Sequence, residues 1–275
     1  MVTLFALGSS LVWGTSDFFA GMASKRRHPV AVVGWTQGLA LVALTGLVLW
    51  HWGSVTWHGW PLWSVAAGLS GLAGLVCFYT ALSTGTMGVV APIASLGVIV
   101  PVTLGVATGD QPSAWAWVGM VIAMVGVTLA SGPELSGAVS GRPVLLAVGA
   151  AVCFGCTLFS LDRGARSSTL MTLWGMRLTS VSLLLILALV LRTTGGVERR
   201  EWPELLAIGI GDLCANALFG LASSRGSVSL TSVLGSLYPV VTAGLAWLVL
   251  KERMRPVQYV GSVLAIAGAM VIALA

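Results

Sequence analysis

Residues 6–18 read ALGSSLVWGTSDF, and residues 147–159 read AVGAAVCFGCTLF. A shift of 141 positions aligns the two stretches and places Gly14 on Gly155. Shifts of 141 or 142 produce further identical or similar pairs: Ala6 with Ala147, Trp13 with Phe154, Phe18 with Phe159, Ser95 with Ser236, and Pro61 with Pro203. A nearly constant offset over most of a chain indicates an internal repeat. We interpret residues 1–130 and 143–275 as two repeats, joined by a linker at 131–142.

Both repeats are strongly apolar. Hydrophobic residues make up 57% of the 275-residue chain, charged residues only 8%, and the mean hydropathy is +0.96. An average soluble domain is about 25% charged, so this chain lacks the polar surface that a water-soluble protein needs. The composition predicts an all-α integral membrane protein, because a polyhelical bundle satisfies its backbone hydrogen bonds within each helix.

Apolar runs of the length of a membrane crossing recur along the chain. A helix needs about 20 mostly apolar residues to cross the hydrocarbon layer. By this criterion we expect ten transmembrane helices, at 2–22, 29–50, 61–82, 88–107, 114–130, 143–160, 168–191, 203–222, 230–250 and 256–274. Pro101, Pro239 and Pro92 fall within these ranges and are candidate sites of helix bending.

The number of crossings per repeat predicts how the repeats are oriented. Each repeat has five predicted helices, so the second must enter the membrane with the opposite polarity. Inverted repeats recur in transporters, where the substrate site lies near the bilayer midplane between the repeats. The expected architecture is therefore two five-helix inverted repeats around a central cavity.

The sequence also resembles a known family. Trp13-Gly14 in the first predicted helix and GSLYPVVTAGLAWLVLKERMRPVQYVGSVLAIAGAMVI at 235–272 are similar to EamA-type members of the drug/metabolite transporter superfamily. The motif positions of the second repeat are Pro239, Glu252, Gly261 and Gly268, whereas the first repeat has Val98 or Pro101 for the proline and Asp110 for the glutamate. The resemblance implies a ten-helix transporter of small organic solutes, often an exporter of amino acids, metabolites or drugs.

The basic loop residues predict a membrane orientation. Ten lie in loops that share one side: Lys25, Arg26, Arg27, Arg142, Arg192, Arg199, Arg200, Lys251, Arg253 and Arg255. Only Arg163, Arg166 and Arg225 lie in loops on the other side. Because Lys and Arg are enriched in cytoplasmic loops, this distribution predicts that both termini face outwards. The resemblance implies cytoplasmic termini instead.

Asp17 places a carboxylate inside the first predicted helix. A charge at the bilayer centre costs roughly 2.5–3.5 kcal/mol on insertion scales, so such a residue normally faces the protein interior or a wet cavity. At about 100° per residue, Trp13 and Asp17 share one helix face. We predict that Asp17 lines a cavity, where it binds a substrate amine or carries a proton; the alternative is a structural partner for a neighbouring helix. Asp17 aligns with Leu158, and this asymmetry between the repeats favours the functional interpretation.

Two further charges lie inside predicted helices, Arg177 in the seventh and Asp212 in the eighth. An unpaired buried charge is costly, so we predict that they form an ion pair. They form either a permanent structural pair or a site in which Arg177 holds a substrate carboxylate while Asp17 or Asp212 meets an amine. A zwitterion such as an amino acid would suit the second arrangement. Asp17 and Asp212 are the candidate proton carriers.

Other polar and aromatic residues are predicted to line the same cavity. The full set of predicted substrate-binding residues is Trp13, Asp17, Gln37, Tyr79, Trp174, Arg177, Asp212, Asn216 and Tyr238. Packing alone would also account for several of them.

The function indicated is secondary transport by alternating access, with export expected and proton coupling left open. No G-x-x-x-x-G-K-[ST] motif is present, which argues against a built-in ATP motor. A lipid flippase of the same fold is the main alternative. A membrane-embedded lipid-modifying enzyme is less favoured, because His28, His51 and His58 lie near loops with no catalytic motif around them.

Partners and location follow from the same pattern. We expect a small-molecule substrate and membrane lipids as partners, with no nucleic acid, because the basic residues sit in short loops between helices. A homodimer is a candidate assembly, and the sequence leaves the oligomeric state open. No cofactor or metal site is predicted, since Cys153-x-x-Cys156 lacks a second ligand pair. We expect a multi-pass protein of the inner or plasma membrane, from a bacterium.

Overall fold

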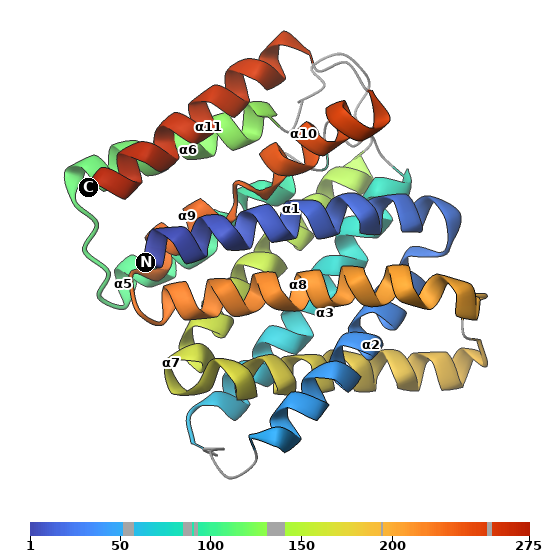
Figure 1. Cartoon of the computed structure of the whole chain (residues 1–275). Helices are drawn as coiled ribbons and strands as arrows, with labels where there is room; N and C mark the ends of the chain where they lie inside the picture. The colour runs from blue at the N-terminus through green and yellow to red at the C-terminus, as the bar shows by residue number, and fades with distance from the viewer. Residues whose placement is uncertain (52–57, 85–89, 91–92, 131–140, 194, 252–254) are drawn as a thin grey trace.

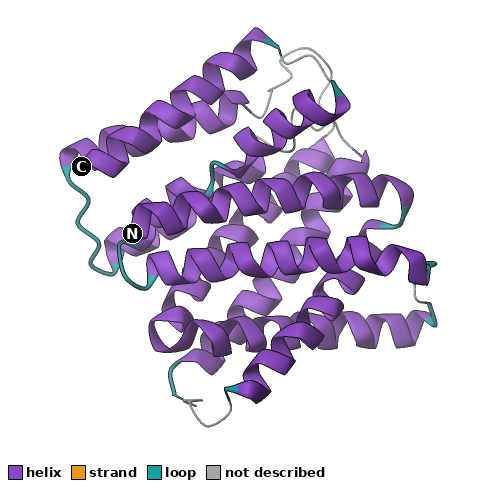
Figure 2. Cartoon of the chain, viewed as in Figure 1, coloured by secondary structure: helices purple, strands orange, loops and turns teal. Residues whose placement is uncertain are grey.

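The computed structural model describes residues 1–51, 58–84, 90, 93–130, 141–193, 195–251 and 255–275. Within these residues the regular structure consists of helices, with no strand (Figure 2). The helices are α1 (Val2–Arg26), α2 (Pro29–Trp50), α3 (Trp60–Thr84), α5 (Ile99–Ala107), α6 (Ala114–Ala130), α7 (Gly141–Leu191), α8 (Trp202–Ser223), α9 (Val228–Gly235), α10 (Tyr238–Leu250) and α11 (Pro256–Leu274), with short 3-10 turns η2 (Leu96–Val98) and η3 (Arg199–Glu201). The expected linker residues 131–140, and Glu252 and Pro92, lie outside the described residues.

The described helices overlap the ranges predicted from hydropathy, and two of these ranges are interrupted. The range 88–107 contains η2 followed by α5, and the range 230–250 is divided between α9 and α10. Both interruptions lie at the positions that the shift of 141 makes equivalent, Ser95-Leu96 and Ser236-Leu237. Six of the described helical stretches are long and apolar enough to cross a membrane: Pro29–Trp50, Trp60–Phe78, Gly141–Leu191, Arg199–Ser223, Val228–Val249 and Pro256–Leu274.

The long helix α7 consists of two arms that meet at Ser168. The backbone of Ser168 is extended, with φ −161° and ψ 111°, so the helix changes direction there. Its hydroxyl oxygen accepts a hydrogen bond from the backbone N–H of Met171 at 3.3 Å, which is the pattern of a helix N-cap. The two arms therefore correspond to the predicted ranges 143–160 and 168–191.

The first helix of each repeat packs on the other repeat. Helix α1 lies against α8, α9 and α10, whereas α7 lies against α3, η2 and α5 (Figure 1). These pairings are equivalent under the internal alignment, because α3 aligns with α8 and α5 aligns with α10. The two repeats therefore share one bundle.

Glycines allow the exchanged helices to approach closely. A β-carbon at Gly14 in α1 would lie less than 3.0 Å from the carbonyl oxygen of Tyr238, at the start of α10. A β-carbon at Gly155 in α7 would lie equally close to the carbonyl oxygen of Gly97 in η2. The shift of 141 relates both glycines and both carbonyl groups. Each repeat thus inserts a glycine against the interrupted helix of the other.

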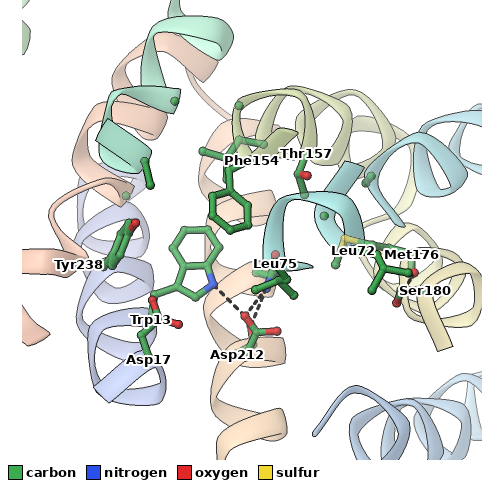
Figure 3. Close-up of a pocket in the computed structure, with 18 of the residues that line it drawn as sticks. Trp13, Asp17, Leu72, Leu75, Phe154, Thr157, Met176, Ser180, Asp212 and Tyr238 are labelled. Atoms are coloured by element: carbon green, nitrogen blue, oxygen red, sulfur yellow. Dashed lines mark hydrogen bonds between the residues drawn. The ribbon is translucent and has the colours of Figure 1, made fainter. Parts of the chain in front are cut away.

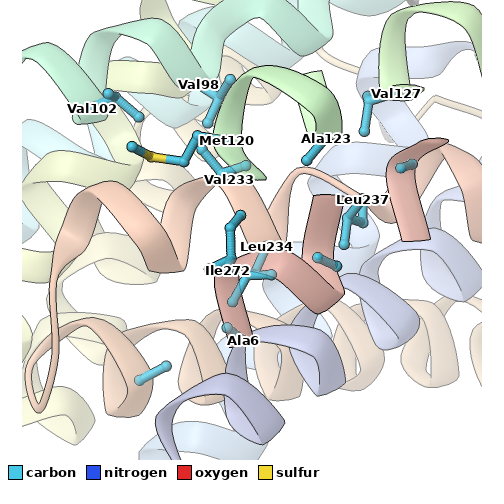
Figure 4. Packing of buried hydrophobic residues seen from close by; sticks show 13 residues of the cluster. Ala6, Val98, Val102, Met120, Ala123, Val127, Val233, Leu234, Leu237 and Ile272 are labelled. Carbon is cyan, nitrogen blue, oxygen red and sulfur yellow. The ribbon is translucent and has the colours of Figure 1, made fainter. Parts of the chain in front are cut away.

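The last helices of the two repeats, α6 and α11, pair with each other beside this bundle (Figure 1). A β-carbon at Gly119, Gly126, Gly261 or Gly268 would clash with the backbone of the facing helix. Small residues at such interfaces permit the close packing that drives helix association in lipid. Side chains from this pair, including Met120 and Ile272, join α1, α5 and α9 in the largest buried apolar cluster (Figure 4).

Polar contacts connect the repeats at both ends of α1. Near its N-terminus, one carboxylate oxygen of Asp110 accepts hydrogen bonds from the Ser229 N–H at 2.9 Å and from the hydroxyl groups of Ser227 at 2.7 Å and Ser229 at 2.8 Å. At the other end, Arg27 donates to Glu201 at 2.9 Å and to Glu198 at 3.0 Å. These contacts join the loop after α5 to the start of α9, and the end of α1 to the start of α8.

Replacing Asp110 with alanine removes the acceptor of the hydrogen bonds from Ser227 and Ser229 and is expected to lower the free energy of unfolding by about 1 kcal/mol, the typical net contribution of a hydrogen bond. Burial by itself raises the pKa of Asp110, but the hydrogen bonds from Ser229 and Ser227 and the charge of Arg166 outweigh it and hold the pKa below its ordinary 3.8. The contribution of a carboxylate with a lowered pKa is complete above the ordinary value and disappears as the pH falls through the folded value.

Thermal unfolding in detergent micelles at several pH values tests this expectation. The difference between wild type and Asp110→Ala should be constant from neutral pH down to the ordinary pKa and shrink below it. A difference that grows on acidification would contradict the assignment. Asp110→Asn retains one acceptor oxygen, so its stability should lie between those of wild type and Asp110→Ala.

Candidate functional site

A cavity of about 150 Å³ lies between the two repeats. Residues of α1, α2, α3, α7 and α8 line it, together with residues at the two helix interruptions. Pockets for drug-sized ligands are usually about 300–1,000 Å³, so this cavity matches a smaller solute. A second space of about 40 Å³ between α1, α2 and α8 shares Asp17, Gln37 and Asp212 with the first.

Arg177 and Asp212 form an ion pair in the wall of this cavity, which confirms the pairing predicted from the sequence. Arg177 donates from a terminal guanidinium nitrogen to one carboxylate oxygen of Asp212. The other oxygen accepts hydrogen bonds from Nε1 of Trp13 at 3.2 Å and from Nδ2 of Asn216 at 3.1 Å (Figure 3). Both oxygens of Asp212 are therefore occupied by protein donors.

Asp17 lies one turn beyond Trp13 on α1 and lines the same cavity (Figure 3). The residue is exposed by its accessible surface. Among the described residues it has neither a hydrogen bond nor an ion pair within the geometric limits of such contacts. Asp17 is thus the available carboxylate of the cavity.

Aromatic rings gather on one side of the cavity. Trp13 from α1, Phe154 from α7 and Tyr238 from α10 lie around the same space (Figure 3). The ring of Trp13 also packs against Phe219, with centroids 5.8 Å apart. Trp13 and Phe154 are equivalent positions of the two repeats, so the repeat symmetry places one aromatic ring from each at the cavity.

The charged residues break this symmetry. Leu158, the equivalent of Asp17, also lines the cavity, and so does Gly71, which aligns with Asp212 at the shift of 141. The scaffold is therefore repeated while the charges are not. Since the fold places an apolar residue or a glycine at the equivalent positions, it does not itself demand these acids.

Seven of the nine predicted substrate-binding residues line the cavity: Trp13, Asp17, Gln37, Arg177, Asp212, Asn216 and Tyr238. Gln37 accepts a hydrogen bond from the hydroxyl of Ser180, which also lines it. The side chain of Tyr79 lies outside the described part of the structure.

Trp174 does not line the cavity. Its Nε1 donates to the hydroxyl oxygen of Thr45 on α2 at 3.1 Å, and its ring packs beside Trp60 and Met171. Trp174 therefore anchors the second arm of α7 to α2. Trp174 lies three residues before Arg177, on the same side of the helix, but neighbouring helices cover different parts of that side.

Phe154 and Thr157 line the cavity but were absent from the predicted set. Phe154 had a sequence signal, since it aligns with Trp13. Thr157 had none, and its hydroxyl group contacts that of Ser70 on α3 at 2.9 Å.

Comparison with known proteins identifies the family to which this fold belongs. The model of the EamA-like transporter family matches residues 1–132 and again residues 141–274. The chain belongs to the EamA-like transporter family. Membership confirms the resemblance seen in the sequence and gives this EamA-like protein a two-repeat architecture of membrane-spanning helices. It indicates a multi-pass membrane transporter of the drug/metabolite transporter superfamily, whose EamA members are transporters rather than enzymes.

Solved structures support the same fold for the EamA-like protein. One titled "Crystal structure of protein" is 21% identical and superposes with a TM-score of 0.83, over 99% of this chain and 96% of that chain. At this identity the likeness shows the fold alone. No curated protein matches the chain.

Proposed function

We propose that this EamA-like protein is a secondary transporter that exposes its central cavity alternately to the two sides of the membrane. The observation that carries the proposal is a small cavity between the two repeats, lined by charged and aromatic side chains. A small organic solute of the amino acid, metabolite or drug class is the cargo, and export is the direction. The protein crosses the inner or plasma membrane of a bacterium ten times, with repeats 1–130 and 143–275 in opposite orientations.

The interrupted helices supply the moving parts of the proposed cycle. The η2–α5 and α9–α10 interruptions both reach the cavity, through Gly97 and Val98 on one side and Gly235 and Ser236 on the other. Alternating access in inverted-repeat transporters rocks one unit against the other around a fixed site. The polar contacts at the two ends of α1 would then open in turn.

Asp17 is the proposed proton carrier, in preference to Asp212. A proton-coupled site needs a carboxylate that is free to gain and lose both proton and substrate. Asp212 is held by Arg177, Trp13 and Asn216, whereas Asp17 faces the cavity without a partner among the described residues.

Asp17→Asn is expected to reduce transport about tenfold or more, the equivalent of at least about 1.4 kcal/mol, while leaving the protein folded. The assay is uptake and efflux in proteoliposomes with a panel of amino acids and organic amines, with and without a pH gradient. Gly21→Ala is a control on the same helix, because a β-carbon there would meet no atom within 4 Å and Gly21 is not part of the cavity lining. Wild-type transport by Asp17→Asn would remove Asp17 from the mechanism, and a wild-type protein that moves no solute would refute the proposed function.

A further inference from the structure

The charges in the cavity wall do not cancel. The described residues that line the cavity include three charged side chains, Asp17, Arg177 and Asp212. Arg177 and Asp212 neutralise each other as an ion pair. Asp17 remains, so the ionised cavity carries one net negative charge. A solute that enters it meets an unbalanced carboxylate in surroundings of low polarity, where charge interactions are strong.

Arg177 is not available to a substrate carboxylate. Its side chain is only 6% exposed, and the nitrogen that donates to Asp212 is already engaged. Its Nε atom is fully buried, with no partner among the described atoms. A carboxylate could reach this guanidinium only by breaking the ion pair with Asp212, and the freed Asp212 would then repel it. The arrangement in which Arg177 receives a zwitterion is therefore disfavoured.

The surroundings of Asp17 suit an ammonium group instead. An organic cation gains from an opposite charge and from the faces of aromatic rings, and tryptophan is the best of these rings. Trp13, Phe154 and Tyr238 border the same cavity as Asp17 (Figure 3). Leu72, Leu75 and Met176 add an apolar wall for the remainder of the molecule.

We propose that the cavity selects a small primary or secondary amine with one positive charge and an apolar body, and that Asp17 is the residue that determines this selection. The inference rests on the proposed transport function for its biological meaning, but it concerns binding and can be measured separately. The same charge balance disfavours anions and gives zwitterions no receptor for their carboxylate.

Four probes that share a phenyl ring and differ in charge test this selection. They are 2-phenylethylamine (cation), phenylalanine (zwitterion), 3-phenylpropanoate (anion) and 2-phenylethanol (neutral). Binding to the full chain in lipid nanodiscs is measured by isothermal titration calorimetry. We expect the amine to bind about tenfold more tightly than the alcohol, equivalent to about 1.4 kcal/mol, and phenylalanine and phenylpropanoate to bind more weakly than the amine.

Substitution of Asp17 should remove the selection without closing the cavity. In Asp17→Asn the amine should bind only as tightly as the alcohol, while affinity for the alcohol stays unchanged. Gly21→Ala, on the same helix but outside the cavity lining, should keep the wild-type ranking. The inference is overturned if the wild type fails to bind the amine, if phenylalanine or phenylpropanoate binds as tightly, or if Asp17→Asn retains the preference.

The same probes in proteoliposomes separate this inference from the function on which it rests. Transport of phenylalanine without transport of the amine would refute the amine selection and leave the transporter assignment intact. Tight, Asp17-dependent binding of the amine in a protein that moves no probe would support the selection and refute transport.

Discussion

Arg177→Ala is expected to lower the free energy of unfolding by about 3 kcal/mol, near the lower end of the range for breaking a buried ion pair. The loss arises because the Asp212 carboxylate loses its main partner, and only the hydrogen bonds from Trp13 and Asn216 remain. We use the lower end of this range because the Asp212 side chain is 36% exposed. The thermal unfolding midpoint in detergent reports the change.

The double variant Arg177→Ala with Asp212→Asn distinguishes a charge effect from loss of packing. Removing both charges eliminates the unpaired ion, so the double variant should be more stable than Arg177→Ala alone. An equal or greater loss in the double variant would show that the guanidinium stabilises the fold by packing, and that the pair contributes little.

Gly14→Ala is expected to destabilise the protein by about 1–3 kcal/mol, the usual cost of overpacking. The added methyl group would meet the carbonyl oxygen of Tyr238, which belongs to the backbone and cannot rotate away. It would also push α1 from Thr242, whose hydroxyl donates to the carbonyl oxygen of Gly14 at 3.0 Å. Gly155→Ala should destabilise the protein to a similar extent, because its added methyl group would meet the carbonyl oxygen of Gly97 in the other repeat.

Gly21 provides the matched control on the same helix. A β-carbon there would meet no atom within 4 Å, so Gly21→Ala should be neutral or stabilise α1 by up to about 1 kcal/mol through helix propensity. Thermal unfolding of the three variants in one detergent gives the comparison. Equal midpoints for Gly14→Ala and Gly21→Ala would contradict the close approach of α1 and α10.

Much of the fold could be predicted from the sequence, because lipid imposes a simple length requirement on each helix. The apolar runs gave the helix positions, and the offset of 141 gave the equivalence of Gly14 and Gly155. The choice of neighbours could not be predicted in this way. Hydropathy marks α1 as apolar but does not indicate that it packs on α10, where Gly14 fits against the backbone carbonyl oxygen of Tyr238.

The candidate site was predictable to the extent that buried charge is costly. That cost identified Asp17, Arg177 and Asp212, and it also predicted the pairing of the last two. The cost of burying a charge does not indicate which acid remains unpaired, because Asp17 and Asp212 lie in equally apolar stretches of sequence. Trp174 illustrates the other limit: its position relative to Arg177 was clear, but Thr45 on a different helix decides which way its ring faces.

The exchange of first helices between the repeats has a consequence for biosynthesis. Helix α1 is synthesised first, whereas α8, the helix with which it makes most contact, lies in the second repeat. When only the first half of the chain has been synthesised, α1 is therefore in the membrane without α8. The early intermediate must hold the acidic side chain of Asp17 without the surroundings that later enclose it. The contacts of α1 with α8, α9 and α10 can therefore form only after most of the second repeat has been synthesised.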